Sequence, residues 1–120
     1  MNAIEKSAPS LRPLPEDGVR EALERSSVHL RREGFTVSWV LLPPPRRGRR
    51  PPDLLAANGS RVVRVFVLQD SEIDTPETRE RIRDAYRQGE TRAYVRWPMS
   101  WRLLSNLSRW DLRGVSVSGW

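Results

Sequence analysis

Arginine is concentrated in one short stretch of the chain, where it could bind phosphate groups. Residues 43–52 read PPPRRGRRPP, and their four arginines are Arg46, Arg47, Arg49 and Arg50. The five prolines fix the backbone and remove amide donors, so we expect a stiff, exposed, polyproline-like loop. Guanidinium groups on a stiff loop suit phosphate contacts, because little conformational entropy is lost on binding. The alternative is a solvated connector whose charge prevents self-association.

The rest of the composition excludes several kinds of chemistry. The chain has no cysteine, which excludes disulfides and thiolate metal sites. It has one histidine, His29, which makes a histidine-based zinc site implausible and excludes any mechanism that needs two imidazoles. Because His29 lies between Val28 and Leu30 in a helical pattern, a half-buried or surface histidine is the more ordinary interpretation.

The net charge of +6, from 21 basic and 15 acidic residues, favours a polyanionic partner. Nucleic acid, DNA in particular, is the leading interpretation, against a simple effect on solubility or an acidic protein partner. No apolar run approaches the length of a membrane span. The N-terminal residues lack the basic-then-apolar order of a signal peptide. We therefore expect a cytoplasmic protein without membrane contact.

Periodicity predicts the elements that must position these groups. Residues 1–15 hold three prolines and no periodicity, which indicates an irregular arm before a single domain at 16–120. A helix is expected over 16–33, because its apolar and small residues form one stripe, and Gly34 would end it. Strands are expected over 35–42, 53–57 and 61–68, the last two joined by a turn at Asn58-Gly59.

The second half of the sequence predicts a helix, a strand, a short helix and a strand. The helix spans 76–88, with a cap at Asp74 or Thr75, Pro76 in its first turn, and Ile82, Ala85 and Tyr86 facing inward. A strand over 91–97, a short helix capped by Ser100 and a strand over 114–120 follow. The short helix has one expected apolar stripe: Leu103, Leu104, Leu107 and Trp110. The fold class is therefore α/β, with a mixed central sheet flanked by helices.

Five tryptophans are many for a domain of this size. Trp39 and Trp110 fit apolar stripes of the predicted elements. Trp97 and Trp101 could form an exposed aromatic surface for a protein partner or for stacked bases, or could cap the ends of the sheet. Trp120 closes an expected edge strand, which could pair with a second copy in a homodimer.

The stretch PDLLAANGSRVVRVFVLQD, residues 52–70, with this order of elements, resembles the PD-(D/E)XK nuclease superfamily. The resemblance covers residues 16–119 and implies a restriction-endonuclease-like α-β-β-β-α-β(-α-β) fold. It also implies a site in which an aspartate of the second strand and an acidic residue of the third hold Mg²⁺, helped by a lysine and an acid of the first helix.

Mapped onto this chain, the resemblance is incomplete at its catalytic core. Asp53 matches the aspartate of the second strand, and Glu21 or Glu24 could match the acid of the first helix. The third strand contains no acidic residue and no lysine. Its E-x-K positions read Arg64-Val65-Phe66, or Phe66-Val67-Leu68 in another register. One carboxylate rarely holds a hard divalent cation, so we expect no metal and no cofactor. Asp53 could equally pair with a nearby arginine, Arg64 included.

These observations predict a non-catalytic pseudo-nuclease that binds nucleic acid, alone or within a DNA-processing assembly. Arg46, Arg47, Arg49 and Arg50 would carry the phosphate contacts, with Arg61 and Arg64 as lesser candidates. One alternative is an active Mg²⁺-dependent nuclease, in which Asp53 works with a migrated carboxylate from Asp70, Glu72 or Asp74, and Gln69 replaces the lysine. The more ordinary interpretation of the acidic stretch 70–74 is a solvated loop before a helix. A second alternative is a protein adaptor or inhibitor that binds no DNA.

Overall fold

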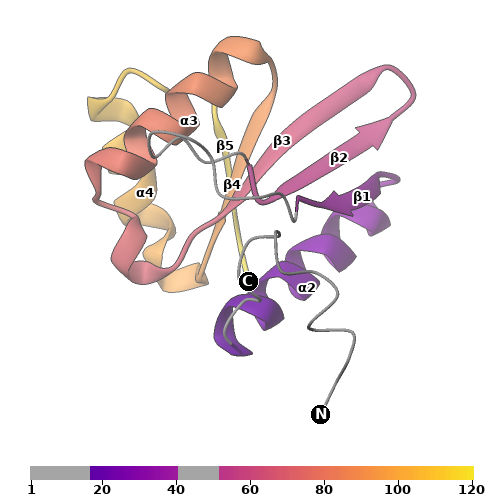
Figure 1. Cartoon of the computed structure of the whole chain (residues 1–120). Coiled ribbons are helices and arrows are strands. Elements are labelled where there is room, and N and C mark those ends of the chain that lie inside the picture. Colours follow the sequence, from indigo (N-terminus) through magenta and orange to yellow (C-terminus); the bar gives the residue numbers. More distant parts are fainter. Residues whose placement is uncertain (1–16, 41–51) are drawn as a thin grey trace, which may run out of the picture.

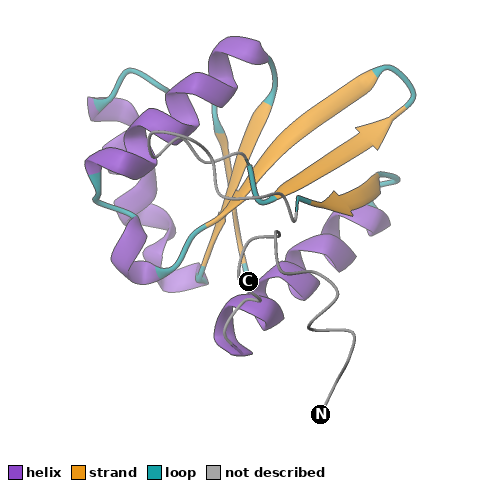
Figure 2. Cartoon of the chain, in the orientation of Figure 1, coloured by secondary structure: helices purple, strands orange, loops and turns teal. Residues whose placement is uncertain are grey.

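The computed structural model describes residues 17–40 and 52–120. The expected arm at 1–15 and the arginines at 46–50 lie outside the described residues. The described part is an α/β structure with a five-stranded mixed sheet, so the α/β class and the mixed sheet are confirmed (Figure 2). None of its helices is both long and apolar enough to cross a bilayer.

The elements follow the expected order. The helices are α2 (Asp17–Arg32), α3 (Pro76–Gln88) and α4 (Ser100–Arg109), with short 3₁₀ turns η2 (Asp70–Glu72) and η3 (Trp97–Met99). The strands are β1 (Thr36–Trp39), β2 (Leu54–Asn58), β3 (Arg61–Val67), β4 (Thr91–Val95) and β5 (Ser116–Gly119). Strand order in the sheet equals chain order. The pairs β1–β2 and β2–β3 are antiparallel, whereas β3–β4 and β4–β5 are parallel.

Local chemistry explains where these elements begin and end. Gly34 (φ 98°) ends α2 in the left-handed conformation that glycine adopts without strain. Asn58 pairs with Arg61, so the hairpin loop is Gly59-Ser60, with the positive φ at Gly59. The Thr75 hydroxyl accepts the amide of Thr78 and so caps α3, as one of the two expected caps.

The sheet separates two apolar clusters, with α2 on one of its faces and α3 and α4 on the other (Figure 1). One lies between the sheet and α2 and includes Leu30, Val63 and Val65. The other lies between the sheet and the pair α3 and α4, and includes Phe66 and Leu107. Because side chains alternate along a strand, β3 supplies both clusters. The expectation that the third strand is central and covered on both sides is therefore confirmed over its second half.

Four local expectations were wrong. The strand expected over 91–97 ends at Val95, because Trp97 and Pro98 begin η3. Ser100 does not cap α4, since its hydroxyl bonds to the Trp97 carbonyl from within the helix. Leu104 and Tyr86 were expected to face the core, but they are 45% and 40% exposed. Both lie at the margin of their helix stripe, where the sheet no longer covers the side chain.

Candidate functional site

Asp53, the residue matched to the strand-two aspartate, is buried and already bonded within the protein. It lies immediately before β2 and is 6% exposed. Its Oδ2 accepts the Val67 amide at 2.8 Å, and its Oδ1 lies 3.6 Å from Nη2 of Arg81. Arg81 comes from α3 and is itself 7% exposed. The Asp53 carboxylate therefore belongs to a buried ion pair that links the sheet to α3.

The Arg81 guanidinium is held from three sides. Besides Asp53, it lies 5.1 Å from the centre of the Phe66 ring, in cation–π geometry, and 3.9 Å from Oε2 of Glu72. A positive charge beside Asp53 balances the carboxylate and repels a divalent cation. An arginine partner for Asp53 was anticipated, but Arg64 was the one named. Arg81 could have been found from the sequence, because it shares the apolar stripe of Thr78, Ile82 and Ala85.

The register of the sheet identifies the residues of β3 beside Asp53. Leu54 pairs with Val65, the Asp53 amide donates to the Val65 carbonyl at 2.9 Å, and the Asp53 carboxylate accepts the Val67 amide, so Asp53 lies beside Phe66. The second of the two proposed registers, Phe66-Val67-Leu68, therefore faces Asp53. Both Phe66 and Leu68 are completely buried, in the apolar cluster beneath α3 and α4. Apolar side chains thus occupy the positions where the resemblance requires a carboxylate and a lysine.

The acidic residues after β3 are engaged in other interactions. Asp70 accepts two short bonds from the guanidinium of Arg96, and Asp74 pairs with Arg102. Glu72 accepts the Gln69 amide in a capping box and also lies near Arg81. Among the described residues no three acidic or histidine side chains gather as a metal site would require. These contacts agree with the more ordinary interpretation of residues 70–74, a polar stretch that precedes a helix.

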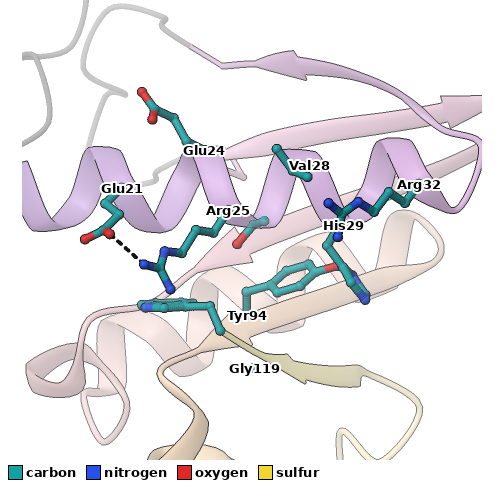
Figure 3. A pocket seen from close by; sticks show the side chains of 10 residues that line it. Glu21, Glu24, Arg25, Val28, His29, Arg32, Tyr94 and Gly119 are labelled. Carbon is teal, nitrogen blue, oxygen red and sulfur yellow. Dashed lines mark hydrogen bonds and ion pairs between the residues drawn. The ribbon is translucent and has the colours of Figure 1, made fainter.

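Glu21 and Glu24 lie on the side of the sheet opposite to Asp53. Both are exposed residues of α2. Helix α2 packs against the face of the sheet to which Leu54 and Ala56 contribute their side chains. Asp53, next to Leu54, points to the other face, toward α3. Figure 3 shows Glu21 turned toward Arg25, with their ion pair at 2.8 Å, and Glu24 pointing away from Tyr94. These glutamates and Asp53 therefore cannot share one metal ion.

The glutamates line an open groove of about 530 Å³ between α2 and the ends of β4 and β5. His29 and Tyr94 also line it, with Nδ1 of His29 2.6 Å from the Tyr94 hydroxyl (Figure 3). His29 is thus the half-exposed, bonded histidine that its helical position indicated. Arg92 donates to the Tyr94 hydroxyl at 3.4 Å and to Glu33 at 2.8 Å. The four side chains form one network that ties α2 to β4.

The pKa values of Glu33 and Tyr94 are shifted within this network. The hydrogen bond from Arg92 lowers the pKa of Glu33, and burial raises the pKa of the Tyr94 hydroxyl. Because the pKa of Glu33 is lower in the folded state than its ordinary value of 4.5, the ionised carboxylate stabilises the folded state above about that pH. This stabilisation is lost as the pH falls through the pKa that Glu33 has in the folded state. Tyr94 therefore stays neutral at physiological pH, while Glu33 stays ionised.

The Glu33–Arg92 pair makes folding stability depend on acid pH. We expect the free energy of unfolding to decline as pH falls below about 4.5, and the Glu33→Gln variant to lose part of that dependence. The expected contribution is under about 1 kcal/mol, because Glu33 is 38% exposed and its charge is screened. Urea unfolding at several acid pH values measures it, with Glu24→Gln as the control. Identical pH profiles for the wild-type chain and Glu33→Gln would contradict the expectation.

The arginines proposed as phosphate contacts lie in different places. Arg61 is at the hairpin turn, remote from Asp53, and forms a two-point pair with Glu90 at 2.6 and 2.8 Å. Arg64 is partly exposed on β3, near Gly89, and forms no ion pair within 17–40 and 52–120. The segment with the other four is bounded by Val40 and Pro52. The Val40 amide donates to the Asp53 carbonyl at 3.0 Å, so the two residues that flank this segment, Val40 and Pro52, both adjoin Asp53.

Comparison with protein-family models, curated proteins and solved structures found no significant match to this chain. Its function is therefore inferred from its own residues.

Proposed function

We propose that this chain is a non-catalytic, restriction-endonuclease-like protein that binds nucleic acid, DNA in particular, and does not cleave it. The pairing of Asp53 with Arg81 is the observation that carries the non-catalytic part of the proposal. A guanidinium supplies the positive charge that a metal ion would bring to that carboxylate. Phe66 and Leu68 leave the adjacent strand without a second ligand.

The topology supports the nuclease-like part of the proposal. An antiparallel trio of strands is followed by a helix and then by a strand parallel to the third, and Asp53 opens the second strand. This is the α-β-β-β-α-β order that the resemblance implies, with α4 and β5 added at the end. In such a sheet, loops that follow parallel strands meet at one edge, where ligands commonly bind. Asp53 lies at that edge, bonded to Val40, the last described residue before the segment 41–51.

The distribution of charge supports nucleic acid as the partner. Most arginines of the described residues are used in ion pairs, such as Arg96 with Asp70 and Arg61 with Glu90. Residues 41–51, by contrast, contain four arginines and no acidic residue. The proposal for these four rests on their sequence and on the position of the residues that flank them. Such a cluster binds phosphates with a strong dependence on salt.

Two measurements test the proposal. Fluorescence anisotropy with a labelled oligonucleotide at low and high salt should show binding that weakens steeply with salt. Incubation of plasmid with the protein and Mg²⁺ or Mn²⁺ should leave the plasmid intact. Metal-dependent cleavage that Asp53→Ala abolishes would establish the active nuclease instead. Absence of binding at low salt would favour a protein adaptor, for which the exposed Trp97 and Trp101 are the specific observation.

A further inference from the structure

Two tryptophans and a leucine form an exposed apolar stripe along η3 and α4. Trp97, Trp101 and Leu104 follow the i, i+4, i+7 spacing of one helix face. They are 69%, 80% and 45% exposed. The alternative expectation was that these tryptophans cap the ends of the sheet. Only Trp97 does so, through its contact with the end of β5, which is described next. An apolar patch of this kind on a monomer is often an interaction surface.

The stripe is continuous with the edge strand β5. The Trp97 amide donates to the Trp120 carbonyl at 2.9 Å. The Trp97 ring also packs so closely on Gly119 that a Cβ there would lie 2.6 Å from Trp97 Cε3. Because β5 is last in the strand order, its outer amides and carbonyls have no strand partner among the described residues. Its sequence, SVSG, has neither the charge nor the proline that commonly protects an edge strand.

The charges beside the stripe favour protein over nucleic acid as its occupant. Arg96 and Arg102, each next in sequence to one of the tryptophans, are paired with Asp70 and Asp74. Each guanidinium is neutralised by an aspartate of its own chain, so this is not the basic surface that nucleic acid requires. A border without net charge does not repel an identical border when two copies meet about a two-fold axis.

The stripe alone is too small for a stable interface, so such an interface must include a further surface. Two tryptophans offer roughly 300 Å² or more of apolar surface. A stable interface needs roughly 800 Å² per partner. Pairing of β5 with the β5 of a second copy would extend both sheets and add the missing area, because the stripe and the edge strand adjoin each other. Neither surface is sufficient alone.

We propose that the stripe of Trp97, Trp101 and Leu104, together with the edge of β5, binds a second copy of this chain in a two-fold homodimer. The inference does not depend on nucleic-acid binding, since none of its residues is among the proposed phosphate contacts.

Sedimentation velocity over a dilution series up to about 100 µM tests the dimer. The wild-type chain should dimerise, and the double variant Trp101→Ser/Leu104→Ser should weaken dimerisation at least about tenfold. The matched control is Leu55→Ser/Val62→Ser, which removes two comparably exposed apolar side chains from the β2–β3 hairpin and should leave dimerisation unchanged. Circular dichroism of each variant confirms that it is folded.

Because the chain has no cysteine, crosslinking gives a second readout. Ser105→Cys, on the exposed side of α4 beside the stripe, should form a disulfide-linked dimer on mild oxidation, whereas Ser60→Cys at the hairpin turn should not. A wild-type chain that stays monomeric throughout the series would overturn the proposal. So would equal dimerisation of both double variants. Loss of oligonucleotide binding in a stripe variant whose dimerisation is unchanged would assign the tryptophans to stacked bases instead.

Discussion

Replacing Arg81 by methionine should lower the free energy of unfolding by about 3–5 kcal/mol. The substitution keeps much of the side-chain volume but leaves the Asp53 carboxylate buried without its cationic partner. The Val67 amide would remain as a hydrogen-bond donor, which is insufficient to replace a full positive charge. Urea unfolding followed by circular dichroism measures the loss.

A double-mutant cycle separates the charge effect from the packing effect. The Asp53→Asn/Arg81→Met variant buries no charge in this pair, so it should be more stable than Arg81→Met alone. Arg83→Met, on the same helix, is the matched control, because Arg83 pairs with Glu80 at the surface. It should cost at most about 1 kcal/mol. If Arg81→Met and Arg83→Met were equally destabilising, the buried pair would not have the structural role assigned to it.

Replacing Arg46, Arg47, Arg49 and Arg50 together by glutamine should abolish most nucleic-acid binding. Four phosphate contacts give a wild-type affinity that falls roughly 100-fold between about 50 and 200 mM salt. The quadruple variant should lose at least a similar factor at low salt, together with most of the salt dependence. Anisotropy titrations with the same oligonucleotide at both salt concentrations measure the two effects.

The matched control removes four other arginines: Arg79, Arg83, Arg87 and Arg113. These are replaced by glutamine at exposed sites whose ion pairs contribute little to stability. The net charge changes by the same amount, so any general electrostatic effect is equal in the two variants. Equal losses of affinity would show that total charge, and not the segment 41–51, governs binding. An unaffected quadruple variant would exclude that segment.

The sequence predicted the elements better than it predicted the side-chain contacts. Helix periodicity and the signals at Gly34, Thr75 and Gly59 are local, so they located α2, α3 and the hairpin closely. The predictions for the ends of β4 and α4 were less accurate. Whether Trp97 continues the strand or begins a 3₁₀ turn depends on its contact with Gly119, which is distant in the sequence.

The face of the sheet on which each candidate residue lies depends on information that no local pattern contains. Periodicity placed Glu21 and Glu24 on a helix surface but could not show which face of the sheet that helix covers. Arg81 was overlooked because a charged residue in an amphipathic helix normally faces solvent. Its burial follows from tertiary packing, in which Asp53 and the Phe66 ring together compensate the guanidinium.

Strand order that equals chain order also bears on how this molecule folds. Each strand can join the sheet next to the strand made just before it, and no strand must be inserted between two others. The contacts between strands therefore join elements that are consecutive in the sequence, which favours folding during synthesis from the N-terminus. The last strand, β5, joins only after the other four strands have been made.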